Sequence, residues 1–335
     1  LERQDLVRDP GRPDACPVPG RPGHRAPGPR NRVRLPRDQS HQPGLTPGVT
    51  HTRIAPSPSG FLHLGNAVNF LLARWVADAE PGSRVDLRID DLGLPVRPDH
   101  LADVFWALDW LGIPISAGPV DPDDFWRGYA QRDAIDRFRA AAASLGPEWT
   151  YACECSRTIV ARRAPGVADP CADSQLPWIP GRTALRFRVR GGPASDSTTR
   201  AALRRLGVGR DHVDEEMGDF VVWRRDDLPA YQLVSVLTDE DAGVDTIVRG
   251  RDLLPSSAAQ VLLAQPLGAR RFSRARFVHH DLVGDATGVK LSKRDNADAL
   301  RAIAERGDGR ARVLAAATAV ADRTRDLYLR SATSE

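Results

Sequence analysis

The stretch from Thr52 to Asn66, T-R-I-A-P-S-P-S-G-F-L-H-L-G-N, constrains the fold more than any other part of the chain. It opens with β-branched residues, breaks at two prolines and a glycine, and then enters an apolar-periodic run from Ala67 to Ala79. That order predicts a strand, a turn and a helix. Such a turn offers unpaired amide donors and the positive end of a helix dipole beside His63, which together suit a phosphate. A purely structural turn is the alternative interpretation.

A second segment stands out because of its lysines. The chain has 45 arginines and only two lysines, Lys290 and Lys293, both within V-K-L-S-K-R from Val289 to Arg294. Lysine carries a compact ammonium on a flexible stem, whereas arginine presents a planar fork. The pair therefore indicates a site that needs an ammonium group. A solvated Lys/Ser turn is the alternative.

These two segments together resemble the signature pair of class I aminoacyl-tRNA synthetases. His63-Leu64-Gly65-Asn66 is similar to their H-I-G-H element, and Lys290-Leu291-Ser292-Lys293-Arg294 is similar to K-M-S-K-S. The segment R-I-A-P-S-P-S-G from Arg53 to Gly60 resembles R-F-A-P-S-P-T-G of the glutamyl group, and L-R-I-D-D from Leu87 to Asp91 resembles L-R-I-E-D. The resemblance covers roughly residues 52–300.

The resemblance implies an α/β fold: a doubly wound parallel sheet, the Rossmann-like catalytic domain of the class, with a small inserted acceptor-binding and zinc-loop subdomain. We expect the two halves of the catalytic domain at 51–146 and 219–295, and the insertion with the cysteines at 147–218. Residues 296–335 should form a short helical segment without an anticodon-binding domain. Within the first half, apolar periodicity predicts helices at about 98–111 and 124–145.

Residues 1–50 contain ten of the 27 prolines and no periodic apolar face, so we expect a disordered Pro/Arg-rich tail. The chain begins at Leu1, and this stretch could be a tag, a fragment edge, a wrongly translated upstream region or a basic RNA-tethering arm. No apolar run reaches the ~18 residues of a membrane span, and no signal sequence opens the chain. We therefore expect a cytoplasmic monomer without a membrane partner.

The net charge of +3 is unevenly distributed. Residues 1–50 hold nine arginines against five acidic residues, which leaves 38 basic and 39 acidic residues in 51–335. Any RNA contact of this balanced body must come from local patches. The candidate patches are Arg186, Arg188 and Arg190, or Arg270, Arg271 and Arg274.

Three of the four cysteines, Cys153, Cys155 and Cys171, are close in sequence. Their spacing is more typical of a metal site than of a disulfide framework. Three thiolates make an incomplete tetrahedral set for Zn²⁺, which Asp169, Asp173 or water could complete. Compact members of the resembled family have Y-x-x-x-C here, whereas this chain has Val167 in place of the tyrosine. Cysteines without a metal are the alternative.

Two charged residues follow predicted strands. Asp90 comes after the alternating strand pattern Ser83–Ile89, and Arg249 ends the short strand that contains Ile247 and Val248. Ligands collect at the carboxyl ends of the strands of a doubly wound sheet, so a carboxylate and a guanidinium there can bind a zwitterion. A turn carboxylate and a surface ion pair are the respective alternatives.

The resemblance implies activation of L-glutamate by ATP with Mg²⁺, with His63 and Lys293 as catalytic residues. It implies that Arg53 and Arg249 hold the side-chain carboxylate and that Asp90 holds the α-ammonium group. The residues it places at ATP are Pro56, His63, Gly65, Asn66, Lys290, Ser292 and Lys293. Those it places at glutamate are Arg53, Ile54, Ala55, Pro56, Ser57, Asp90, Tyr231 and Arg249.

Three positions depart from the family pattern: Asn66 replaces the second histidine, Asp90 replaces a glutamate, and Gly93 stands near a frequent aspartate. With only 42 residues after Lys293, the chain resembles the shortened relatives, the glutamyl-queuosine tRNA(Asp) synthetases. These join glutamate to the modified wobble base, which implies the anticodon loop of tRNA(Asp) as partner. A paralogue with another acceptor and a non-catalytic RNA- or nucleotide-binding relative are the alternatives.

Overall fold

The computed structural model describes residues 49–93, 95–155, 169–283 and 299–332, with the side chains of 325–332 left aside. All of these residues belong to one compact unit. The lysine segment with Lys290, Ser292 and Lys293, the expected tail, and Val167 lie outside the described residues.

The first structural unit is a parallel strand pair with a helical crossover. Strand β1 (His51–Ile54) pairs in parallel with β2 (Arg84–Leu87), and helix α1 (Leu64–Asp78) connects them. The expected strand, turn and helix are confirmed. Thr52, Arg53 and Ile54 are all buried, as expected of a parallel strand covered on both faces.

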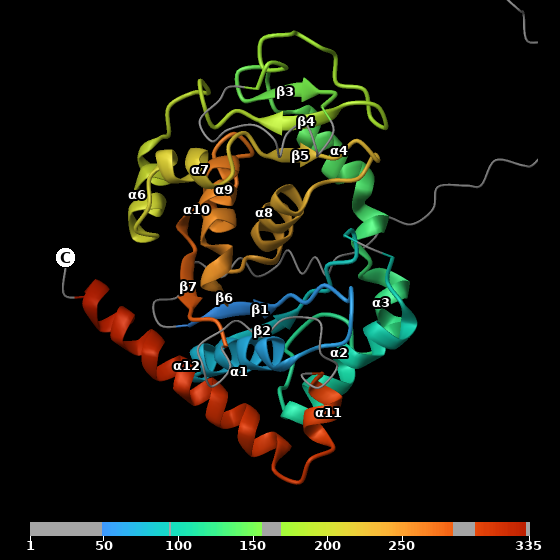
Figure 1. Ribbon diagram of the computed structural model, residues 1–335, viewed down its shortest axis with the longest axis vertical. Helices are drawn as coiled ribbons and strands as arrows, with labels where there is room; N and C mark the ends of the chain where they lie inside the picture. Colours follow the sequence, from blue (N-terminus) through green and yellow to red (C-terminus); the bar gives the residue numbers. More distant parts are fainter. Residues whose placement is uncertain (1–48, 94, 156–168, 284–298, 333–335) are drawn as a thin grey trace, which may run out of the picture. The chain divides into compact units, whose positions relative to one another are not determined.

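A second parallel pair is formed by β6 (Thr246–Gly250) and β7 (Arg276–His280). Between them lie the 3-10 turn η2 (Arg251–Leu253), α9 (Leu254–Ala264) and the short α10 (Arg270–Arg274). The backbone amide of Asp245 donates to the His51 carbonyl at 3.0 Å, so β6 lies beside β1 (Figure 1). The carboxyl ends of β1, β2 and β6 are therefore close together.

The helices that follow β2 differ in how well the sequence predicted them. Helix α2 (Pro98–Leu111) has the expected bounds and ends at Gly112, whose φ of 67° suits glycine. The single helix expected at 124–145 is wrong, because the chain forms α3 (Pro122–Gly128), the 3-10 turn η1 (Gln131–Ala134) and α4 (Ile135–Ala143). The break places the Gln131 amide on the buried Asp91 carboxylate, at 2.8 Å.

A small antiparallel sheet stands between the two parallel halves in the chain. Its strand order is β3 (Thr150–Cys153), β4 (Ala184–Phe187) and β5 (Val221–Trp223). The Arg-rich stretch before β5, whose pattern predicted no element, forms α6 (Ser197–Arg205) and α7 (Arg210–Glu216). Helix α8 (Tyr231–Ala242) then leads into β6.

Two apolar cores meet at β6. The first holds α1, α2, the β1–β2 pair, α11 (Leu300–Ala304) and α12 (Gly309–Ala332), and the second holds β4, β5, α8 and α9. Val248 packs in the first core and Ile247 in the second, since successive strand residues point to opposite faces. Arg249 at the end of β6 thus sits next to both cores. Among the described helices, none is long and apolar enough to cross a membrane.

Candidate active site

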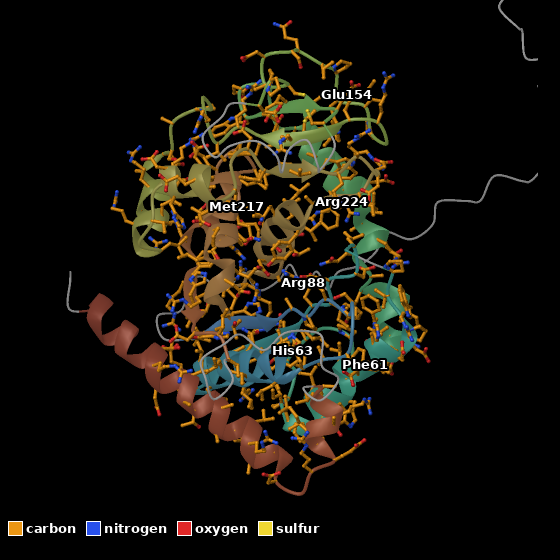
Figure 2. All side chains as sticks on the ribbon, viewed as in Figure 1. Phe61, His63, Arg88, Glu154, Met217 and Arg224 are labelled. Carbon is orange, nitrogen blue, oxygen red and sulfur yellow. The ribbon has the colours of Figure 1, made fainter. Side chains whose placement is uncertain are left out.

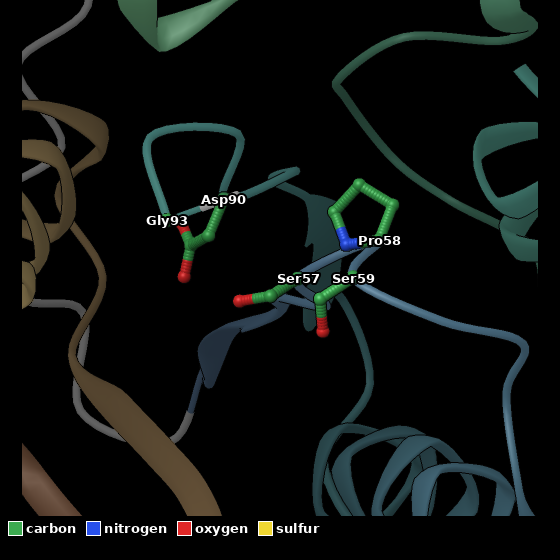
Figure 3. A pocket seen from close by; sticks show the side chains of 5 residues that line it. All are labelled: Ser57, Pro58, Ser59, Asp90 and Gly93. Atoms are coloured by element: carbon green, nitrogen blue, oxygen red, sulfur yellow. The ribbon is translucent and has the colours of Figure 1, made fainter. Parts of the chain in front are cut away.

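The β1–β2 ladder continues past both strands and creates a pocket at their carboxyl ends. The Arg88 amide donates to the Ile54 carbonyl and the Asp90 amide to the Pro56 carbonyl, both at 2.9 Å. This pairing brings the loop after β1 against the loop after β2. The resulting cavity has a volume of about 240 Å³. Figure 3 shows the residues that line it, Ser57, Pro58, Ser59, Asp90 and Gly93. Two residues expected at glutamate, Ser57 and Asp90, therefore face one space.

His63 is the N-cap of α1. Its Nδ1 accepts from the Gly65 amide at 3.1 Å, and Asn66 Oδ1 accepts from the His63 amide at 3.0 Å, which completes a capping box. A Cβ at Gly65 would lie about 3.0 Å from the imidazole, so any larger residue at this position would have to displace His63 slightly. Asn66 thus closes the turn through its side-chain oxygen, and its amide nitrogen keeps the donor capacity that a phosphate needs.

The chain that follows the lysine segment returns to the His63 turn. Ala299 forms an antiparallel bridge with His63, and the Leu300 amide donates to the Leu62 carbonyl at 2.8 Å. The lysines themselves lie outside the described residues. The first described residue after them is nevertheless fixed beside the first signature segment, although the two are more than 200 positions apart in sequence.

A buried ion-pair network connects the strand ends to α8. Arg53 Nε lies 3.0 Å from Asp239 Oδ1, and Arg88 Nη1 lies 2.5 Å from the same oxygen. Arg88 also donates to both oxygens of Asp90, at 2.8 and 3.2 Å, and so bridges α8 and the β2 end. Figure 2 labels Arg88 in the region between the ribbon of α8 and the parallel strands. Burial opposes the charged form of Arg88, but Asp239 and Asp90 outweigh it and raise its pKa. Burial likewise favours protonation of Asp239, yet Arg53 and Arg88 hold its pKa below the usual range.

Arg249 is 4% exposed and only partly engaged. Its Nη1 donates to Gln260 Oε1 at 2.9 Å and to Ser257 Oγ at 3.2 Å, while Nη2 has no partner among the described residues. Burial lowers the pKa of Arg249, Tyr231 and Asp239 oppose that shift, and Arg53 and Arg88 add to it. The guanidinium is therefore held in place by neutral side chains, with one edge directed into a buried polar region.

Further buried polar atoms lack partners within the described part of the chain. In the helices around Arg249 they are Gln232 Oε1, Ser235 Oγ, Asp239 Oδ2 and Gln260 Nε2. Each such atom costs about 1–3 kcal/mol when it stays unsatisfied, so native structures seldom keep several together. A group of unpaired donors and acceptors beside three arginines is what a small charged, polar ligand would satisfy.

The remaining predicted glutamate residues contribute in different ways. Ile54 is fully buried in the first core, so its side chain cannot contact a ligand and only its backbone remains. Tyr231 begins α8, is 40% exposed and interacts electrostatically with both Arg88 and Arg249. The structure thus brings Arg53 and Asp90 into one network through Arg88 and Asp239. Lys290 and Lys293 lie outside the described residues.

Sequence reasoning missed several residues of this network. They are Arg88, Asp239, Ser257, Gln260 and His279. One signal was available for Asp239, which follows Leu233 and Val236 at helical spacing on the buried face of α8. A carboxylate on an apolar helix face needs a cationic partner. No comparable sequence signal marks Ser257 or Gln260.

His279 on β7 supports Arg249 from a second side. Its Nε2 lies 2.9 Å from Ser257 Oγ, which in turn contacts Arg249. Burial, followed by the charges of Arg249 and His280, lowers the pKa of His279 to about 4. The imidazole is therefore neutral at pH 7 and adds no further positive charge to the site.

The three cysteines form a separate cluster at the end of β3. Sulfur atoms of Cys153, Cys155 and Cys171 and a carboxylate oxygen of Asp169 all lie within 4.8 Å of one another. Asp173, the other expected candidate, is exposed and outside this group. Three soft sulfur donors with one carboxylate fit tetrahedral Zn²⁺. Burial raises the pKa of Cys153 to about 12, so a bound cation would have to displace its proton.

Comparison with known proteins identifies the family. The model of the class I tRNA synthetases (E and Q), catalytic domain, matches residues 49–163 and 194–320. The glutamyl-Q tRNA(Asp) synthetase of Geobacter sulfurreducens is 36% identical over 264 residues, which cover 75% of this chain and 77% of the relative. The enzyme of the same name from Deinococcus radiodurans is 33% identical over 276 residues, which cover 78% and 86% respectively.

Solved structures share the fold. The glutamate-tRNA synthetase of Elizabethkingia anophelis aligns with a TM-score of 0.53 and 23% identity, covering 73% of this chain and 53% of that one. The glutamate tRNA ligase of Elizabethkingia meningosepticum, solved in complex with its amino acid, gives 0.52 and 23%, with 52% of its chain covered. The present chain thus spans about half the length of these solved enzymes. Their likeness confirms the expected α/β class of the catalytic domain.

The family match covers both halves of the strand-and-helix framework that carries the candidate site. The relatives named above are all ligases of the aminoacyl-tRNA synthetase type. The chain therefore belongs to the class I tRNA synthetases of the E and Q group and, within that group, to the glutamyl-Q tRNA(Asp) synthetases.

Proposed function

We propose that this protein activates L-glutamate with ATP and transfers it to the queuosine base at the wobble position of tRNA(Asp). The observation that carries the proposal is Arg249, a buried guanidinium whose Nη2 lacks a partner in the described part of the chain. Arg53, Arg88 and Asp239 lie in the same electrostatic network. Arg249 is a second arginine beside Arg53, and unlike Arg53 it contacts only neutral side chains. A guanidinium without an acidic partner favours a substrate with a side-chain carboxylate over one with an amide.

In the first step, an oxygen of the glutamate α-carboxylate attacks the α-phosphorus of ATP. The bond to the β-phosphate breaks, pyrophosphate leaves and glutamyl-adenylate forms. Such transfers are accelerated mainly by alignment and by charges placed where negative charge develops. The α1 N-terminus with His63 and Asn66 would supply donors for the phosphates, Lys293 would supply an ammonium group, and Mg²⁺ would bind through the phosphates.

The glutamate would lie with its side-chain carboxylate on Arg249 Nη2. Arg53 on β1 would contact the same carboxylate, and Asp239 already orients its Nε. Asp90 would receive the α-ammonium group in the cavity that it shares with Ser57. Arg88 and Gln131 hold the Asp90 carboxylate in place, since Gln131 Nε2 donates to it at 2.7 Å. Asp90 is thus a preorganised anion despite being one methylene shorter than the usual glutamate.

The cysteine cluster would hold a structural Zn²⁺ through Cys153, Cys155, Cys171 and Asp169. When bound, the ion would fix the end of β3 to the loop that contains Cys171. Asp169 would take the position that the missing tyrosine ligand leaves open. Its Oδ1 accepts from the Cys171 amide at 2.9 Å, which orients the carboxylate toward the sulfur atoms.

The activation step is tested by glutamate-dependent exchange of labelled pyrophosphate into ATP in the absence of RNA. We expect exchange with glutamate and at least ~100-fold less with glutamine, because Arg249 would face a neutral amide. Exchange that requires tRNA, or that prefers glutamine, would contradict the proposed activation.

The acceptor is tested with labelled glutamate and two pools of tRNA(Asp), with and without queuosine. Only the queuosine-containing pool should be labelled, and removal of the 3′-terminal adenosine should leave that labelling unchanged. Equal labelling of both pools, or loss of labelling after the adenosine is removed, would assign the chain to an ordinary charging reaction or another acceptor.

A further inference from the structure

Exposed arginines over most of the described surface are neutralised by a nearby carboxylate. Arg74 pairs with Asp78, Arg84 with Asp86, and Arg323 with Asp281. Similar pairs recur on α3, α4 and the turn after β5, and even Arg190 pairs with Asp214. This pairing fits the nearly equal numbers of basic and acidic residues in 51–335.

The largest group of arginines that departs from that rule lies on one surface, which we call the α6–α10 face. It carries six exposed arginines on two helices that contain no acidic residue. They are Arg200, Arg204 and Arg205 on α6, and Arg270, Arg271 and Arg274 on α10. None of the six forms an ion pair within the residues that the structure describes. Arg200 and Arg205 donate only to backbone carbonyls, of Ser195 and Ser273.

The two helices form one continuous surface. They are in contact, and Arg205 Nη2 at the end of α6 donates to the Ser273 carbonyl of α10 at 3.1 Å. Two carboxylates at these helix ends already accept from backbone amides, Asp196 from Thr199 and Glu240 from Phe272. A groove of about 760 Å³ lies beside α6, and Arg200 and Arg204 line it together with Asp211 and Asp214. The positive charge of the α6–α10 face is therefore concentrated and accessible.

The other patch expected from the sequence is engaged inside the molecule. Arg186 is 9% exposed, donates to the Asp219 carbonyl and lies 3.5 Å from Asp169. Arg188 donates to two backbone carbonyls and stacks over Tyr151 at 4.8 Å. Of the two patches, only the one with Arg270, Arg271 and Arg274 remains open to a partner.

We propose that the α6–α10 face binds the phosphate backbone of the RNA substrate, outside the pocket where glutamate is activated. The proposal rests on the proposed function, because it assigns a docking surface to that reaction's RNA. A regularly charged backbone suits it, since six guanidinium groups without an ion pair among the described residues offer repeated donors for phosphate oxygens. Backbone contacts would set the position of the RNA and leave base recognition to the active-site groove.

The test compares two triple variants with the same change in net charge. R270Q/R271Q/R274Q removes the unpaired charges of α10, whereas R74Q/R84Q/R323Q removes paired ones elsewhere. Binding of purified tRNA(Asp) is measured over a salt series. For the α10 variant we expect Kd to rise at least ~10-fold and the slope of log Kd against log salt to fall by about 2, since each lost phosphate contact removes about 0.7–0.9. The control variant should bind like the wild type.

A second variant, R200Q/R204Q on α6, makes the test independent of the folding of α10, and its Kd should rise as well. RNA-free pyrophosphate exchange with glutamate should stay at the wild-type level in all three variants, because none of these residues lies in the activation site. Equal RNA affinity of the α10 and control variants would overturn the docking surface. Absence of exchange in the wild type would instead overturn the proposed activation and leave the RNA measurement interpretable.

Discussion

Arg249 shows how a single side chain can be set up for a ligand that is not present. Burying a guanidinium is costly, and burial is the main cause that lowers its pKa. Its local partners are neutral, Gln260 and Ser257, rather than a carboxylate in direct contact. A stable structural ion pair would have used the nearest carboxylate, Asp239, which is already shared by Arg53 and Arg88. Arg249 thus keeps its charge available.

Replacing Arg249 tests this arrangement directly. R249Q should raise KM for glutamate by about 10- to 100-fold, since a charge-assisted hydrogen bond contributes about 1.5–3 kcal/mol. Initial rates of pyrophosphate exchange over a glutamate series measure the change. R251Q is the matched control, because Arg251 is exposed and pairs only with Asp281. Equal KM values for the two variants would remove Arg249 from the substrate site.

For the two signature segments we predict an effect on the rate of adenylate formation rather than on KM. H63A and K293A should each lower the rate of adenylate formation by about 100-fold or more, because each removes a group placed where charge develops in the transition state. K293R should also be impaired, since a planar fork replaces a compact ammonium. H100A, a histidine on α2, serves as the control. Wild-type activity in K293R would refute the argument from the two lysines.

His279 predicts a pH dependence of stability. Its folded pKa of about 4 lies below the ordinary value of 6.5, so the unfolded chain binds more protons between these values. The contribution of His279 is complete above pH 6.5 and is lost as the pH falls toward 4. Urea unfolding across this window should show a smaller loss of unfolding free energy in H279N than in the wild type. Parallel curves for the two proteins would contradict the neutral imidazole.

At the scale of elements, the sequence predicted the turns and helices whose signals lie in neighbouring residues. The turn at Pro56–Gly60, the helix that follows it and the helix Pro98–Leu111 each depend on residues close in sequence. The break between α3 and α4 depends instead on Asp91, whose carboxylate accepts a hydrogen bond from the Gln131 amide, 40 positions later in the chain. Periodicity alone cannot reveal such a partner, so the sequence predicted one continuous helix.

The same limit applies to the candidate site. Motif resemblance pointed to Arg53, Asp90 and Arg249, but the residues that hold them come from other elements. Asp239 reaches Arg53 across 186 positions, and Gln260 belongs to a helix that carries no recognisable signature. Contacts between distant elements are set by packing of the two cores, which a single sequence does not encode in any short pattern.

The cysteine cluster gives a prediction for the loop after β3. Freshly purified protein should contain about one equivalent of zinc per chain, and D169N should lower zinc affinity by at least ~10-fold, because a carboxylate ligand becomes a neutral amide. C155S should loosen the same loop, which limited proteolysis can detect. D173N is the matched control, since Asp173 is exposed and lies outside the cluster. Less than about a tenth of an equivalent in the wild type would favour cysteines without a metal.

At the scale of the whole molecule, the distribution of ion pairs over the surface is more informative than the net charge. Residues 51–335 are almost neutral, yet the α6–α10 face carries unpaired arginines while most other exposed arginines have carboxylate partners. Long-range attraction of RNA to the body should therefore be weak, and local contacts should determine affinity. The nine arginines of residues 1–50 are a second source of positive charge that could contribute.

Removing residues 1–48 separates these two sources. The cut falls just before Thr50, whose amide donates to Ser83 Oγ at 2.9 Å and whose side chain is buried, so the first anchored residue is kept. We expect an unchanged melting temperature and unchanged pyrophosphate exchange, because a proline-rich stretch without an apolar face cannot pack. The Kd for tRNA(Asp) and its salt dependence should also be unchanged if the α6–α10 face carries the backbone contacts. A weaker Kd with a reduced salt slope would assign those contacts to a basic arm instead, and a clear drop in melting temperature would show that the stretch packs after all.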